Sequence, residues 1–183
     1  MEKNEKNERD EGEENKKNKI KSNEEKDLIP VKKDYDKYKV KYNLPEFLEL
    51  DKFFDIGHLE LKETDLFLRK VRQIITDKII SYLRFLEILV NPGNNPLFLF
   101  KLTRKLNNSD KEGLLELYEK LGKMHLEVVL LDLNYDAEKE AEFIIKTFNV
   151  FNKEIKINLS KIIRKLIKEE ISEKKDNSDS YFG

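Results

Sequence analysis

Cysteine and tryptophan are absent from this 183-residue chain, and histidine occurs only twice. Without cysteine there can be no disulfide, no thiolate nucleophile and no cysteine metal ligand. The two histidines, His58 and His125, stand apart from any motif. A zincin needs two histidines at i and i+4, and a di-iron bundle needs paired Glu-x-x-His, but Gly122 lies three residues before His125. We therefore expect no metal site and no cofactor.

The chain also has little net charge and no long apolar run. Its 36 basic and 37 acidic residues leave a formal charge of −1, so no overall field attracts nucleic acid or an anionic membrane. The most apolar run, 79–90, contains Arg84 and Glu87, whereas a membrane span needs about 20 largely uncharged residues. The N-terminal residues lack the apolar core of a secretory signal. We expect a cytoplasmic protein that does not enter a membrane.

Two short acidic motifs resemble metal sites only in part. Asp132-Leu-Asn-Tyr-Asp136 is similar to the start of an EF-hand loop, but its sixth position is Ala137 rather than glycine and its twelfth is Phe143 rather than glutamate. We interpret the segment as a turn between helices, with Asp136 as the cap of the second.

Catalytic motifs are missing as well. Glu116-Leu-Tyr-Glu119 has the spacing of a magnesium-binding pair, yet no second acidic pair with matching spacing follows it. The chain has only six glycines, with no glycine-rich phosphate loop and no Gly-x-Ser-x-Gly. We predict that the protein is not an enzyme.

Apolar side chains are unevenly distributed along the chain. Residues 1–27 contain only Met1 and Ile20 as apolar side chains, too few to offset an ordering cost of roughly 1–2 kcal/mol per residue. We predict charged, disordered tails at 1–27 and 172–183. In 28–43, Tyr38, Val40 and Tyr42 alternate with lysines, which predicts an extended strap. The helical domain is expected at 44–171.

Within that domain, apolar residues recur every three or four positions, the period of a helix with one buried face. In 109–133 the predicted core stripe consists of Leu114, Leu117, Leu121, Met124, Val128 and Leu131. The predicted helices cover 45–56, 64–90, 96–107, 109–133 and 137–170, with Pro45 opening the first, Gly57 following it, and a Ser109–Glu112 capping box opening the fourth. The fold class is all-α: an antiparallel helical bundle of three long and two short helices. The last helix would be roughly 50 Å long against roughly 40 Å for the first long one, so we expect its final turns to extend past the bundle.

The predicted short helix after Pro96 indicates a docking surface. The run 97–102 is apolar on all sides, so it must be covered by the bundle or by a partner. The candidate partner-binding residues are Leu97, Phe98, Leu99 and Phe100. The function that we favour is a non-catalytic protein–protein interaction or assembly module, with a protein partner or self-association.

A second hypothesis is an RNA-, DNA- or ribosome-associated factor. The last predicted helix starts acidic and turns basic, which the helix macrodipole also favours. Its basic half makes nucleic acid a possible partner. The candidate nucleic-acid-binding residues are Lys153, Lys156, Lys161, Arg164, Lys165 and Lys168. A third hypothesis is a helical bundle that binds a small molecule in its interior.

Overall fold

The computed structural model describes residues 31–59, 66–91, 93 and 97–179, and within these it leaves the side chains at 98, 99, 102 and 169–179 undescribed. Contacts divide the chain into two compact units, Met1–Phe67 and Leu68–Gly183. The second unit begins one residue into a long helix. The range 44–171, which we expected to form one bundle, is therefore divided at Phe67.

In the first unit, residues 31–42 are helical, and the extended strap predicted there is wrong. Tyr38 and Tyr42 lie one helical turn apart and stack with ring centroids 6.3 Å apart. Tyr38 also stacks on Phe67 at 4.9 Å. The apparent alternation misled the prediction because Val40 is 86% exposed and takes no part in packing. Residues 28–30 of the predicted strap lie outside the described residues.

Tyr35 links the two helices of the first unit. Its buried ring meets Phe47 edge to face at 5.4 Å, and its hydroxyl donates to the Pro45 carbonyl at 2.8 Å. Burial, followed by the nearby Glu46 carboxylate, raises the pKa of Tyr35. Helix α2, Phe47–Phe54, follows and buries Phe47, Leu50 and Phe54.

The end of α2 corrects a second prediction. The residue after the helix is Asp55, in the left-handed region at φ 56°, and not Gly57. Gly57 lies in the short 3₁₀ helix η1, Ile56–His58, where its N–H donates to Asp51 Oδ1 at 2.7 Å. Pro45 also lies one residue before the cap Glu46 and does not open the helix.

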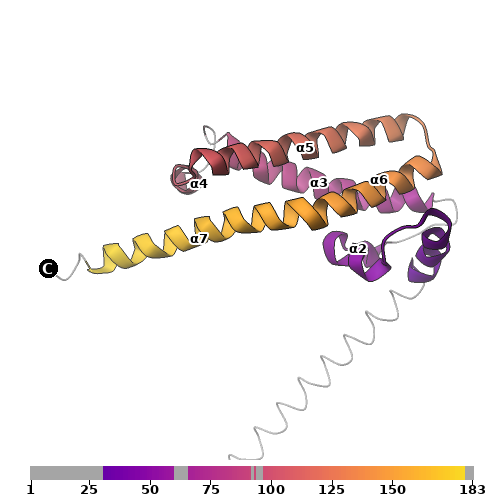
Figure 1. Cartoon of the computed structure of the whole chain (residues 1–183), viewed down its shortest axis with the longest axis horizontal. Helices are drawn as coiled ribbons and strands as arrows, with labels where there is room; N and C mark the ends of the chain where they lie inside the picture. The colour runs from indigo at the N-terminus through magenta and orange to yellow at the C-terminus, as the bar shows by residue number, and fades with distance from the viewer. Residues whose placement is uncertain (1–30, 60–65, 92, 94–96, 180–183) are drawn as a thin grey trace, which may run out of the picture. The chain divides into compact units, whose positions relative to one another are not determined.

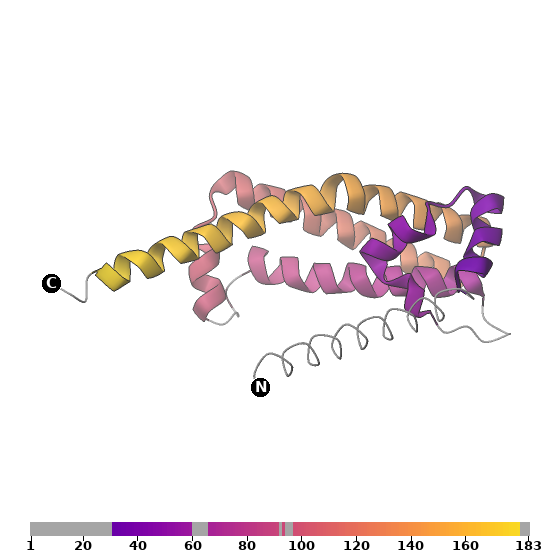
Figure 2. The same ribbon diagram turned by 90° about the horizontal axis from the view of Figure 1, so that it is seen from below.

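The second unit contains the long helices (Figures 1 and 2). Helix α3 spans Phe67–Val90, α4 spans Leu97–Thr103 and α5 spans Asn108–Leu133. The third long rod is continuous and consists of α6, Ala137–Val150, the π-helical turn η3, Phe151–Ile155, and α7, Lys156–Asp179. These rods alternate in direction, and no strand occurs among the described residues. The all-α antiparallel fold class is therefore confirmed.

The N-caps of α5 and α6 explain where these two helices begin. Asn107 is the N-cap of α5, because its side chain accepts from the Asp110 N–H at 2.8 Å while Asp110 accepts from the Asn107 N–H. The capping box predicted at Ser109 and Glu112 is therefore wrong by two residues. Asp136 caps α6 as predicted, accepting from the backbone of Glu138 at 2.9 Å.

Helix α7 is longer than composition indicated. It continues to Asp179, so residues 172–179 are helical and the boundary predicted at 171 lies too early. The remaining predicted tail, 180–183, and the predicted N-terminal tail, 1–27, lie outside the described residues. The last turns of α7 extend past α4 and the start of α5, as expected from the difference in helix length (Figure 1).

Candidate protein-binding surfaces

The core face of α5 matches the predicted stripe. Its buried residues recur every three or four positions, and every one of them was expected to face the bundle: Leu114, Leu117, Leu121, Met124, Val128 and Leu131. Residues on the opposite side of the same helix should be polar if α5 were an ordinary surface helix. The first half of α5 follows this rule, with Glu112, Glu116 and Glu119, but its last turns do not.

Four aliphatic side chains near the C-terminal end of α5 lie on the side opposite its core stripe. We call this set the α5 outer face, and its members are 49–79% exposed: Leu126, Val129, Leu130 and Leu133. Leu126, Leu130 and Leu133 follow one another at three- and four-residue steps.

The two charged residues within 126–133 are paired inside the chain. Glu127 pairs with Lys146 of α6. Asp132 accepts from Arg72 of α3 at 2.6 Å. The other side chains of this segment are aliphatic.

A hollow lies beside this surface. It has a volume of about 410 Å³ and lies between α5 and α6, with Leu130 and the buried Phe143 among its lining residues. Lys139, Glu142 and Lys146 also line it. The α5 outer face thus combines protruding leucines with an adjacent recess.

The predicted docking residues of α4 lie at the opposite end of the bundle. Leu97 is 69% exposed and Phe100 is partly exposed. The side chains of Phe98 and Leu99 lie outside the described residues. The structure therefore leaves two of the four candidates partly or largely uncovered and does not describe the other two.

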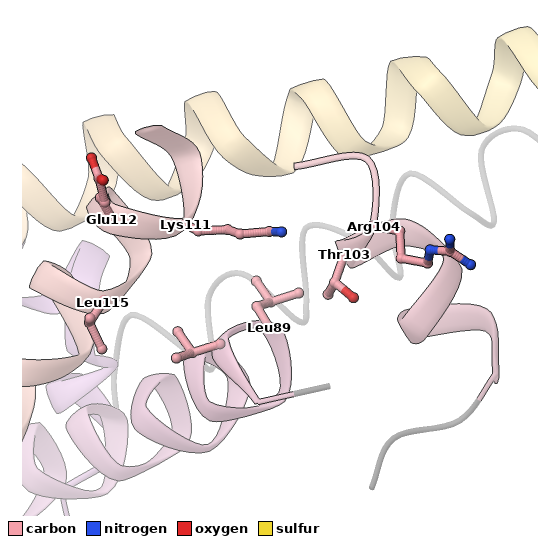
Figure 3. Close-up of a pocket in the computed structure, with 7 residues that line it drawn as sticks. Leu89, Thr103, Arg104, Lys111, Glu112 and Leu115 are labelled. Atoms are coloured by element: carbon pink, nitrogen blue, oxygen red, sulfur yellow. The ribbon is translucent and has the colours of Figure 1, made fainter. Parts of the chain in front are cut away.

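Next to α4 is a second hollow, of about 330 Å³, between the end of α3, the turn after α4 and the start of α5 (Figure 3). Leu89, Val90 and Leu115 give it apolar walls, and Thr103 is buried at one side. In Figure 3 Lys111 extends from α5 across the hollow toward α4. It is an open, amphipathic recess and the structural counterpart of the small-molecule hypothesis.

The basic half of the last helix is placed on the side of α7 opposite its core stripe. Lys153, Lys161 and Arg164 are exposed, as are Lys156 and Lys168. Lys165 differs, because its ammonium pairs with Asp110 of α5. This hydrogen bond is the main reason that the pKa of Asp110 lies below its ordinary value. Five of the six candidates are thus exposed, and the sixth is half-buried and joins the last helix to α5.

A buried ion cluster joins the first turns of α3 to the first turns of α6, and nothing in the sequence indicated it. Arg72 of α3 and Glu140 of α6 are 1% and 0% exposed, and Arg72 Nε donates to Glu140 Oε2 at 2.5 Å. Arg69 lies 3.7 Å from the second oxygen of Glu140, which has no hydrogen-bond partner among the described residues. The guanidinium of Arg69 also lies over the Tyr135 ring at 4.9 Å.

The partial metal motifs are used structurally. Of the residues that resemble an EF-hand loop, Asp132 accepts from Arg72 and Asp136 caps α6. Within the described part of the chain, no group of three or more histidine or acidic side chains is placed to hold a metal ion. Likewise, none of its helices is both long and apolar enough to cross a bilayer.

Comparison with known proteins gives no match: no family model, no curated protein and no solved structure resembles the chain at a significant level. The case for a function therefore depends on these surfaces alone. Sequence reasoning missed the α5 outer face, although a signal was present, because Leu126, Val129, Leu130 and Leu133 do not belong to the stripe that it assigned to the core.

Proposed function

We propose that the protein is a non-catalytic helical interaction module that binds a protein partner through the α5 outer face. The observation that supports it is a helix with two apolar faces, of which the bundle covers one. Exposed apolar patches of roughly 300–600 Å² are the largest found on typical monomers and often mark binding sites.

The size of the α5 outer face can be worked from its exposed fractions. Full burial of a leucine side chain contributes about 3 kcal/mol, which at about 25 cal/mol/Å² corresponds to roughly 120 Å². Four aliphatic side chains that are 49–79% exposed therefore offer roughly 320 Å² of apolar surface on this scale. That area lies within the range of functional patches.

Site-specific photo-crosslinking in the cells that make the protein tests this proposal. A photoreactive residue at position 126 should give adducts with protein, and the additional substitution Leu130→Glu should remove them. The matched control carries the same group at Glu138, which is exposed on α6. Equal adducts at positions 126 and 138, or none at 126, would contradict the proposal.

A second candidate function is nucleic-acid binding by α7, supported by the shared exposed face of Lys153, Lys161 and Arg164. Binding through phosphates weakens steeply with salt, because each neutralised phosphate releases counterions. Charge reversal at Lys161 and Arg164 should then reduce affinity for single- or double-stranded RNA in a filter or polarisation assay. Affinity that does not change with salt or with these substitutions would exclude this function.

A further inference from the structure

We infer that the partner of the α5 outer face is a second copy of this chain, in a twofold dimer that buries this face against itself. The inference rests on the proposed function and identifies the partner. Three observations carry it: the area of the face, its shape and the state of the charges around it.

The area meets the requirement for a dimer. Roughly 320 Å² of apolar surface from each copy gives about 640 Å² for a pair. Homodimer interfaces are about 65% apolar, so the complete interface would bury roughly 1,000 Å². Specific interfaces begin at about 1,000 Å², and those below about 1,200 Å² belong to weak or transient complexes. We therefore expect reversible association in the micromolar range.

The shape of the face is self-complementary. In a twofold interface the same surface meets itself, so each copy must supply both the projections and the recesses. Leu133, the most exposed of the four at 79%, projects from α5, and the 410 Å³ hollow opens beside Leu130. A leucine of one copy can enter the hollow of the other, and the reverse contact forms by symmetry. This is the knobs-into-holes arrangement of packed helices.

The charges at the border also favour a second copy. A twofold axis brings identical groups toward one another, which is unfavourable when they carry unpaired like charges. Here Glu127 and Asp132 are already paired with Lys146 and Arg72 of their own chain. Because apolar burial then drives association, the dimer should hold or strengthen at high salt, unlike a complex held by charges.

The experiment uses the full chain and measures its mass by light scattering and sedimentation from micromolar to near-millimolar concentration. The mass should rise from that of one chain toward twice that value. Leu130→Glu should weaken dimerisation at least about 100-fold, since the interface would bury two unpaired carboxylates, each worth about tenfold or more. Leu130 is 68% exposed, so this substitution should leave the fold intact, as circular dichroism can verify.

Ile157→Glu is the matched control, because Ile157 is also an exposed aliphatic residue, on α7. This variant should dimerise like the unchanged chain. A chain that stays monomeric throughout overturns the inference, as does dimerisation that Leu130→Glu leaves intact or that high salt abolishes. If crosslinking from position 126 captures only a different protein while the purified chain stays monomeric, the proposed function stands and the dimer does not.

Discussion

Replacing Arg72 by methionine should remove a large share of the stability of the bundle. Arg72 and Glu140 form a buried ion pair between α3 and α6, with Nε and Oε2 2.5 Å apart and both side chains sealed from solvent. Methionine keeps much of the aliphatic volume of arginine but leaves the Glu140 carboxylate with Arg69 as its nearest cation, at 3.7 Å. The carboxylate then loses its hydrogen-bonded partner and keeps only the longer ion pair with Arg69.

The expected loss in the free energy of unfolding follows from the burial of Arg72 and Glu140. Removing one member of a buried pair costs about 3–5 kcal/mol, against a total stability of about 5–15 kcal/mol for a typical protein. The Asp132 contact adds little, since Asp132 is largely exposed and exposed pairs contribute about 0–1 kcal/mol. For a chain of this size the loss corresponds to a Tm roughly 6–20 °C lower.

Chemical denaturation followed by far-ultraviolet circular dichroism measures this change. Lys146→Met is the control, because it breaks the exposed Lys146–Glu127 pair and should cost at most about 1 kcal/mol. The double variant Arg72→Met with Glu140→Leu replaces both charges by apolar groups and should recover most of the loss. A cost below about 1 kcal/mol for Arg72→Met, or a double variant no more stable than it, would refute this reasoning.

Two further predictions concern α5. At Gly113 and Gly122 an added Cβ would meet no atom within 4 Å. Gly113→Ala and Gly122→Ala should therefore each raise the free energy of unfolding by about 0.5–1 kcal/mol, measured by chemical denaturation. A lower free energy of unfolding in either variant would contradict the open space at that position. Lys165→Met should raise the pKa of Asp110 toward its ordinary value of about 3.9, measured by carboxyl NMR titration. The pKa of Asp110 is lower in the folded protein than in the unfolded chain. The Asp110–Lys165 contact therefore stabilises the fold fully at a pH above the unfolded pKa, and this stabilisation is lost as the pH falls through the folded pKa. An Asp110 titration that is the same in both proteins would show that Lys165 does not set it.

The long helices were predictable because their core stripes repeat with the helical period over many turns. All six residues assigned to the core of α5 are buried, and the cap Asp136 was found correctly. The helix at 31–42 was not found, because Tyr38 and Tyr42 fit a period of two as well as a spacing of four. Only the rings of Tyr35 and Tyr38 against Phe67 decide between these alternatives.

The candidate surfaces were less predictable, for a physical reason. Hydrophobicity shows that a residue favours burial, but whether a neighbour covers it depends on how the helices pack. The apolar run after Pro96 was predicted to be a docking surface because it is short and apolar on all sides. Leu130 and Leu133 were overlooked because they lie among residues of the predicted core stripe in the sequence. The Arg72–Glu140 pair joins residues 68 positions apart, and no local pattern carries that information.

The C-terminal turns of α7 continue well past the last residue of its buried stripe, so small rotations of the helix become large movements at its end. From Leu166, the last residue of its buried stripe, to Asp179 the helix advances about 20 Å at 1.5 Å per residue. A tilt of about 10° at its base would therefore move the tip by roughly 3–4 Å. A fluorophore attached near residue 179 would report small rotations of the rod that a label inside the bundle would hardly register.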